Sequence, residues 1–221
     1  MNASLVRPLV RAELRAEFRA GEVVMTTIPF AASGLLVAAI AIGADTPLLR
    51  RVGPGMLWTI VLLFGSFVTL RRTVSGEPTR QEVLTLLGVD PVIQWVARAA
   101  SSTVLLLGVI AVLVPVTVVI YDPPLTGLAA QAVAAVLVAV GLGALGTLAA
   151  DLTASTRSRT SLVPLIVTPL TLPLVLAAVQ VQEGAVYAAS PWPWLLLAAL
   201  TDVTIVLAGL LAARPLQEGA V

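Results

Sequence analysis

The sequence contains no cysteine, no histidine and no lysine, and only 11% of its residues are charged. The absence of cysteine excludes disulfide bonds and thiolate metal ligands. The absence of histidine removes the most common metal ligand and the usual pH-sensitive side chain. Thirteen basic residues, all arginine, balance twelve acidic ones, so the net charge gives no indication of a nucleic-acid partner.

Apolar residues are abundant instead and make up 58% of the chain. Soluble domains have roughly 45–50% apolar and about 25% charged residues. A soluble protein of 221 residues could not bury so much apolar surface, so lipid must be its solvent. We therefore predict an all-α integral membrane protein with a single transmembrane domain over residues 1–221.

Six apolar segments are each close to the ~20 residues that a bilayer requires. The predicted spans are residues 23–44, 54–70, 94–121, 125–150, 162–181 and 192–213. They leave outer loops at 45–53, 122–124 and about 182–191. With the N-terminus inside, eleven arginines lie at the inner side and only Arg50 and Arg51 lie outside. This asymmetry predicts that both termini are cytoplasmic.

Residues 4–22 have the pattern of an N-terminal helix that lies along the membrane surface. Arginine recurs at every fourth position, beside a parallel apolar stripe. The arginines are Arg7, Arg11, Arg15 and Arg19, and the stripe is Val6, Val10, Leu14 and Phe18. Arginine stems follow an apolar boundary while their guanidinium groups reach the headgroups. An ordinary solvated basic face is the alternative interpretation.

The main polar interruption, residues 71–95, predicts a short amphipathic helix at 79–87 between spans two and three. Thr79 and Glu82 fit a capping box, and Gly88 with Pro91 is a stop signal. Apolar and polar side chains separate onto two faces. The apolar face holds Val83, Leu84, Leu86 and Leu87, and the polar face holds Gln81, Glu82 and Thr85. So short a helix is marginal alone, so we expect it to bind the membrane surface or, in our interpretation, a separate motor protein.

Asp202, near the middle of span six, is the intramembrane polar candidate. A charge at that depth costs about 2.5–3.5 kcal/mol on insertion scales, which makes it a functional hypothesis. We expect it to be protonated or hydrogen-bonded in a subunit interface or a wet cavity, where Thr201 and Thr204 are close enough in sequence to help. A substrate or proton path is the alternative.

Three prolines, Pro164, Pro169 and Pro173, interrupt span five and predict a kinked helix. A hinge or gate and a static bend both fit this pattern. Gly141, Gly143 and Gly146 match GxGxxG, but they lie inside an apolar span and not after a strand. They therefore favour close helix packing over dinucleotide binding.

Several other side chains are expected at the edges of the membrane. Asp151 is expected to be a charge at the cytoplasmic edge, and Trp95 an anchor at the inner interface. Aromatic residues at the outer ends of the spans predict an interfacial belt. They are Tyr121, Tyr187, Trp192 and Trp194. No nucleophile–base pair, paired carboxylates, nucleotide-binding loop or metal cluster is visible in the sequence, so we predict a non-catalytic chain without a metal site.

Three blocks of the sequence are similar to motifs of one family. They are VGPGMLW at 52–58, QEVLTLL at 81–87 and LVPLIVTPLTLPL at 162–174. Together they resemble CcmB, the permease subunit of the ABC-type system of cytochrome c maturation in the bacterial cytoplasmic (inner) membrane. The similarity extends over nearly the whole chain and has the same six-span layout.

The resemblance implies that the helix at 79–87 is a coupling helix in the groove of a CcmA-like ATPase. The implied contact residues are Thr79, Gln81, Glu82, Val83, Leu84, Leu86 and Leu87. ATP and Mg²⁺ then belong to the partner, and paired ATPase subunits imply a second copy of this chain.

The resemblance also implies haem as the cargo of the system. Without histidine or cysteine, axial ligands could come only from Met25, Met56, Tyr121 or Tyr187, or from a partner. We therefore expect partners similar to CcmC and CcmD to hold the haem, and ATP-driven motion to release the chaperone CcmE. The alternatives are export of haem itself along a direct lateral or transmembrane path, an ABC-2 permease for a lipid, drug or polysaccharide, and a non-transport membrane scaffold.

Overall fold

The computed structural model describes residues 6–21, 23–43, 45–74, 88–155, 162–187 and 189–218. Within these ranges the regular structure is entirely helical and contains no strand. The helices are α1 (Val6–Ala20), the π-helical segment η2 (Val23–Thr27), α2 (Ile28–Ile42), α3 (Thr46–Val74), α5 (Pro91–Tyr121), α6 (Leu128–Ser155), α7 (Leu162–Val186) and α8 (Trp192–Glu218). The predicted all-α architecture is confirmed.

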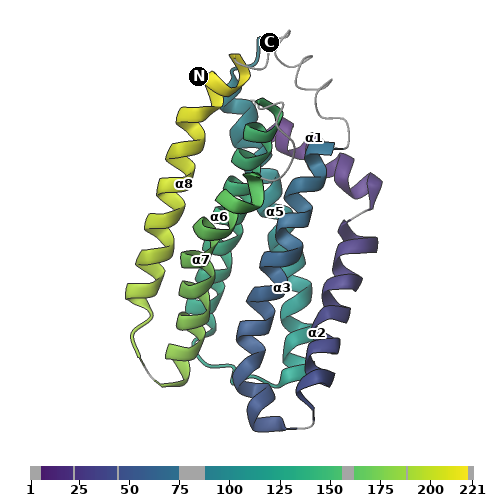
Figure 1. Ribbon diagram of the computed structural model, residues 1–221, viewed down its shortest axis with the longest axis vertical. Helices are drawn as coiled ribbons and strands as arrows, with labels where there is room; N and C mark the ends of the chain where they lie inside the picture. Colours follow the sequence, from purple (N-terminus) through teal and green to yellow (C-terminus); the bar gives the residue numbers. More distant parts are fainter. Residues whose placement is uncertain are drawn as a thin grey trace.

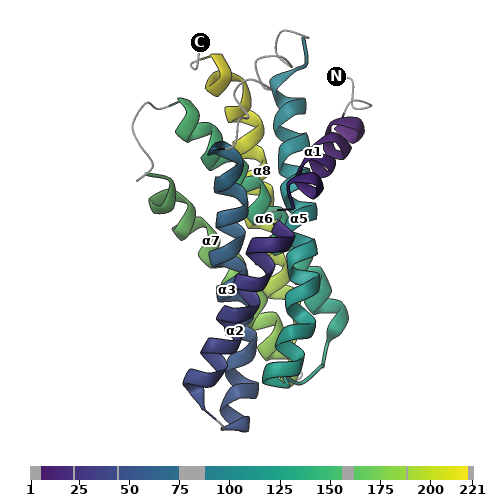
Figure 2. The same cartoon turned by 90° about the vertical axis from the view of Figure 1, so that its right-hand side faces the viewer.

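Six helices in the described part of the chain are long and apolar enough to cross a membrane. They lie side by side in an elongated bundle, whereas α1 lies at an angle to them at one end (Figures 1 and 2). The end of α8, the end of α3 and the start of α5 lie at the same end of the bundle as α1 (Figure 2). The molecule is a multi-pass membrane protein, as predicted.

The helix α3 begins at Thr46, so most of the residues expected in the first outer loop are helical. Asp45 explains the early start, because its Oδ1 accepts a hydrogen bond from the Leu48 amide at 3.2 Å. This is the geometry of a helix N-cap, and Pro47 fits the first turn because its missing N–H is not needed there. In the same way α7 continues to Val186, beyond the predicted end of span five.

The bundle is built around α6, which packs against α3, α5, α7 and α8. Two glycines on α6 make these close approaches possible. A Cβ on Gly143 would lie 2.7 Å from Thr103 Oγ1 and 3.1 Å from the Ala99 carbonyl oxygen of α5. A Cβ on Gly141 would overlap Leu174 of α7 and Asp202 of α8. The predicted role of these two glycines in close helix packing is confirmed.

The helix α1 packs on α5. Its stripe residues Val6, Val10 and Leu14 are half-buried, and Leu14 contacts the hydrophobic core. The four arginines lie on the exposed side of the helix. They are Arg7, Arg11, Arg15 and Arg19. The apolar stripe thus docks on the chain's own bundle, while the location of the helix at the membrane surface stays a prediction.

Two aromatic side chains expected at the membrane interfaces are buried instead. Trp95 is 2% exposed and packs against Gly209 of α8, where a Cβ would overlap the indole. Tyr121 is 1% exposed, and its hydroxyl donates a hydrogen bond to the Leu35 carbonyl oxygen of α2 at 2.8 Å. Glycines on neighbouring helices leave the space that these rings fill. The interfacial assignment of both residues was therefore wrong.

Candidate functional site

The predicted coupling helix at 79–87 lies outside the residues that the structure describes, as do all seven of its predicted contact residues. The structure does describe the helices on either side of it. The helix α3 ends at Val74 and α5 begins at Pro91. Gly88 has a φ of +72°, a left-handed conformation that glycine adopts without strain, and Pro91 is the first residue of α5.

Asp90 fixes the start of α5 in two ways. Its Oδ1 accepts a hydrogen bond from the Val92 amide at 3.0 Å, which caps the helix. Its Oδ2 accepts a hydrogen bond from Arg214 Nη2 of α8 at 3.2 Å. The Val92 amide, followed by the Arg214 guanidinium, lowers the pKa of Asp90 below its usual value. Asp90, three residues after the predicted coupling helix, therefore joins the start of α5 to the last membrane-spanning helix.

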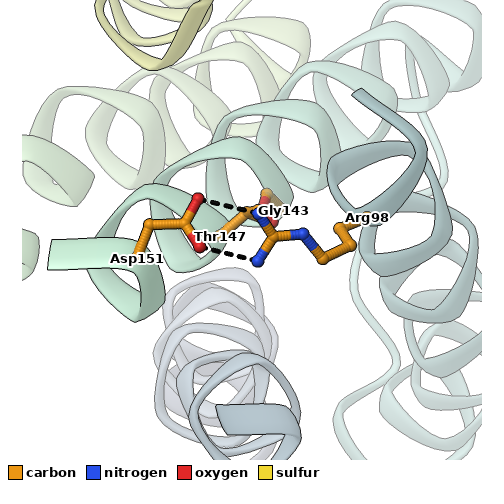
Figure 3. Close-up of polar contacts among 4 residues, drawn as sticks. All are labelled: Arg98, Gly143, Thr147 and Asp151. Carbon is orange, nitrogen blue, oxygen red and sulfur yellow. Dashed lines mark hydrogen bonds and ion pairs between the residues drawn. The ribbon is translucent and has the colours of Figure 1, made fainter. Parts of the chain in front are cut away.

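A second ion pair lies inside the bundle and joins α5 to α6 (Figure 3). Arg98 Nη1 donates to Asp151 Oδ1 at 2.6 Å, and Nη2 donates to Oδ2 at 2.9 Å. The two side chains are only 8% and 12% exposed. Two parallel bonds between a guanidinium and a carboxylate make a strong and strictly oriented contact. Asp151 is therefore part of an interhelical ion pair and not, as expected, merely a charge at the membrane edge.

Local packing explains why these two charges meet. Gly143 lets α6 approach α5 closely, and Asp151 follows about two turns later on α6. Thr147 lies between them on α6, but its hydroxyl donates to the Gly143 carbonyl oxygen at 2.7 Å (Figure 3). Thr147 therefore does not donate to Asp151, and the carboxylate accepts its two hydrogen bonds from Arg98.

Asp202 is buried in the seam where α8 packs on α6 and α7, and it is 5% exposed. Neither of its carboxyl oxygens has a hydrogen-bond partner among the described residues. Thr201 and Thr204 do not assist it, contrary to our expectation. Their hydroxyls donate to the carbonyl oxygens of Leu197 and Leu200, each at 2.8 Å. The acid also faces the interior of a single chain, which differs from the subunit interface that we expected.

At the opposite end of the bundle, Arg50 of α3 forms an ion pair with Asp122, directly after α5. Asp122 has a φ of +46° and ends α5, where its amide donates to the Val118 carbonyl oxygen at 3.0 Å. Both charged side chains are exposed, at 58% and 71%. Sequence reasoning gave Arg50 no role, because its partner lies 72 residues away.

The three prolines of α7 lie in one uninterrupted helix. Pro164 falls in the first turn, where amide groups have no intrahelical partner, so it removes no hydrogen bond. Pro169 and Pro173 lie inside the helix, and each removes one backbone bond. A hinge or gate in α7 stays a prediction. Only Pro169 and Pro173 can contribute to it, because only these two prolines remove a backbone hydrogen bond of the helix.

Comparison with known proteins assigns the chain to a family. The model of the family described as "CcmB protein" matches residues 4–218. The chain belongs to the CcmB family. It is also similar to heme exporter protein B of Bradyrhizobium diazoefficiens, with 24% identity over 215 residues that cover 96% of each chain. The resemblance inferred from the sequence is confirmed.

Two of the blocks that carried the resemblance form helix contacts in this CcmB-family chain. In the block at 52–58, a Cβ on Gly53 would lie 2.7 Å from the Tyr121 Cβ, and Leu57 and Trp58 are buried. The block at 162–174 begins α7 and ends at Leu174, which is fully buried beside Gly141. These residues of the two blocks thus contribute to the contacts of α3 and α7 with the rest of the bundle.

Proposed function

We propose that this CcmB-family chain is the membrane permease subunit of a haem-handling ABC transporter of cytochrome c maturation. The observation that carries the proposal is the family match over residues 4–218 of a bundle with six helices able to span the membrane. The name of the relative, heme exporter protein B, supports haem as the cargo.

In this proposal a CcmA-like ATPase binds ATP and Mg²⁺ and hydrolyses the nucleotide, while this chain catalyses no reaction. The segment at 79–87 is the coupling helix in contact with the ATPase. Paired ATPase subunits require two coupling helices, so two copies of this chain assemble. The eleven inner arginines support a bacterial inner-membrane orientation with both termini, and hence this segment, in the cytoplasm.

The described ion pairs supply a route for motion from the coupling segment into the bundle. The helix α5 begins three residues after Gly88 and is joined to α8 through Asp90 and Arg214. It is joined to α6 through Arg98 and Asp151. A displacement of the start of α5 is therefore transmitted to α6 through the buried two-bond contact of Arg98 with Asp151. Its transmission to α8 is weaker, because Arg214 is 65% exposed where it contacts Asp90.

The described residues offer poor axial ligands for haem. Met25 is 82% exposed and Tyr187 is 71% exposed. Met56 packs against the hydrophobic core, and Tyr121 is buried with its hydroxyl bonded to Leu35. We therefore infer that partners similar to CcmC and CcmD hold the haem. The permease contributes motion that frees the haem-loaded chaperone CcmE.

Copurification of the complex followed by an ATPase assay tests the coupling. Leu86→Ala and Glu82→Ala should leave ATP binding by the partner intact. ATP hydrolysis in these variants should no longer lead to release of the chaperone. Tyr187→Phe, an exposed change at the other end of the bundle, serves as the control and should behave as wild type. Unchanged coupling in both coupling-helix variants would favour a non-transport scaffold.

The bound cargo tests the haem assignment separately. The purified chain without partners should carry no stoichiometric haem, whereas the complex should carry haem. Stoichiometric haem on the isolated chain would contradict the division of labour. A complex that binds lipid, drug or polysaccharide in place of haem would indicate an ABC-2 permease with another cargo.

A further inference from the structure

We propose that Asp202 is a proton-binding site that holds its proton while α8 is packed on α6 and α7, and releases it when α8 separates from them. The ligand is a single proton. The proposal concerns the chain itself and does not depend on the identity of the ATPase or of the cargo.

The groups packed around Asp202 favour the neutral form of its side chain. The residue is 5% exposed, and it contacts α6 at Gly141, the position where a Cβ would overlap both Asp202 Oδ1 and Leu174. Leu174 is fully buried. A glycine on one side and an aliphatic side chain on the other supply no side-chain hydrogen-bond donor to the carboxyl group.

The hydroxyl groups nearest in sequence are already used. Thr201 and Thr204 each donate to a backbone carbonyl oxygen one turn earlier on α8. Within the ranges that the structure describes, neither Asp202 oxygen has a hydrogen-bond partner. An ionised carboxylate in such a site would have lost its hydration without any replacement, which is far more costly than burying the neutral acid.

No charged group within the described ranges faces Asp202 from the elements packed around it. Asp151 of α6 lies roughly 15 Å along the helix from Gly141 and is bonded to Arg98 of α5. Glu183 of α7 lies about 13 Å along the helix from Leu174 towards the other end. Arg214 lies on α8 itself, about three turns away, and is bonded to Asp90. No cation in the described part of the chain compensates the charge, so the site binds a proton.

The proton can leave only with a change in packing. When α8 separates from α6, water enters the seam, the O–H bond of the Asp202 carboxyl breaks, and a water molecule accepts the proton. The electron pair stays on the carboxylate, which other water molecules hydrate, and the accepting water leaves as hydronium. When the helices close again, the carboxylate takes a proton from hydronium before it is buried, which regenerates water. The α6–α8 contact therefore opens more easily at high pH, because ionisation stabilises the open arrangement.

Infrared spectroscopy of the full chain in lipid tests the proton occupancy directly. At neutral pH the wild-type protein should show the carbonyl stretch of a neutral carboxylic acid, shifted in D₂O. Asp202→Asn should remove this band. Asp122→Asn is the control, because it replaces an aspartate whose side chain is 71% exposed. It should remove a carboxylate band and keep the acid band. Absence of the acid band from the wild-type protein would overturn the proposal even if the variants failed to fold.

The coupling to helix separation has its own test, which uses the absence of cysteine from the chain. Ala198 lies one turn before Asp202 on α8 and is 2% exposed. We compare the rate of labelling by a water-soluble maleimide in A198C and in A198C with D202N. For each pH unit, the rate should rise about tenfold more in A198C alone, because below the pKa each pH unit changes the ionised fraction of a titrating group about tenfold. Equal pH dependence in the two backgrounds would refute the link between ionisation and opening.

Discussion

Arg98 of α5 and Asp151 of α6 are joined by two hydrogen bonds, of 2.6 and 2.9 Å, although they are 53 residues apart in the sequence. Their side chains are almost fully buried. A buried pair that loses one partner leaves a charge without compensation, which is strongly unfavourable. The contact therefore holds α6 to the helix that begins beside the proposed coupling segment.

Asp151→Asn should lower the free energy of unfolding by about 3–5 kcal/mol, because Arg98 then stays buried without its counter-ion. Replacing both residues by leucine should restore most of this loss, since neither charge remains. Thermal unfolding of the purified chain in detergent measures both variants. A double variant as unstable as the single one would show that the pair contributes through more than its charges.

The ion pair between Arg50 and Asp122 gives the opposite expectation. Its side chains are exposed, so solvent already screens the charges. Arg50→Gln should lower the free energy of unfolding by only about 0.2–1 kcal/mol. Measured beside Arg98→Gln under the same conditions, it tests whether burial sets the strength of the two pairs. Equal losses would contradict that explanation.

Gly53 and Gly55 form a matched pair on α3. A Cβ on Gly53 would lie 2.7 Å from the Tyr121 Cβ, whereas a Cβ on Gly55 would meet nothing within 4 Å. Gly53→Ala should destabilise the protein by about 1–3 kcal/mol, because the buried tyrosine must move. Gly55→Ala should be neutral or stabilise by up to about 1 kcal/mol through helix propensity. Unfolding temperatures of the two variants compare them directly, and similar values would contradict the packing of Gly53 on Tyr121.

Asp90 should give a pH-dependent contribution to stability. Its pKa is lower in the folded chain than in the unfolded one, first because of the Val92 amide and then because of Arg214. The stabilisation is therefore present above the unfolded pKa, about 4, and is lost as the pH falls through the lower folded value. Asp90→Asn should be less stable than wild type at neutral pH, and the difference should shrink in acid. Arg214→Gln should retain part of this pH dependence, because the Val92 amide remains.

Pro169 and Pro173 should differ from Pro164 if α7 acts as a hinge or gate. Pro169→Ala and Pro173→Ala restore a backbone bond inside the helix, so both should stiffen it and slow the release of the chaperone. Pro164→Ala should keep wild-type activity, because the first turn has no such bond to restore. The release assay with the copurified complex distinguishes them. If none of the three variants changes the rate of chaperone release, the prolines produce only a static bend.

The helical membrane architecture could be predicted because it follows from properties that lie along the chain. Apolar segments of the required length indicate spans wherever their side chains end up. Capping signals are equally local: Gly88, Asp90 and Pro91 mark the boundary of α5 without reference to any other helix. The early start of α3 carried such a signal as well, since Asp45 precedes Thr46 and Pro47, and only the hydropathy of the segment obscured it.

The site residues depend on contacts that no local pattern contains. Tyr121 and Trp95 resembled interfacial aromatic residues, yet both are buried because glycines on other helices make room for them. Asp202 was recognisable as an unusual charge, but its isolation follows from the residues that α6 and α7 place beside it.

The amino-acid sequence alone determined that this protein lies in lipid, how many spans it has and to which family it belongs. Hydropathy, segment length and short motifs can be read along the chain without knowledge of its tertiary contacts. Tertiary structure decided which charges are paired and which are buried alone. Helices from distant parts of the chain approach one another only where small residues allow it, and that packing gave Asp151 a partner and left Asp202 without one.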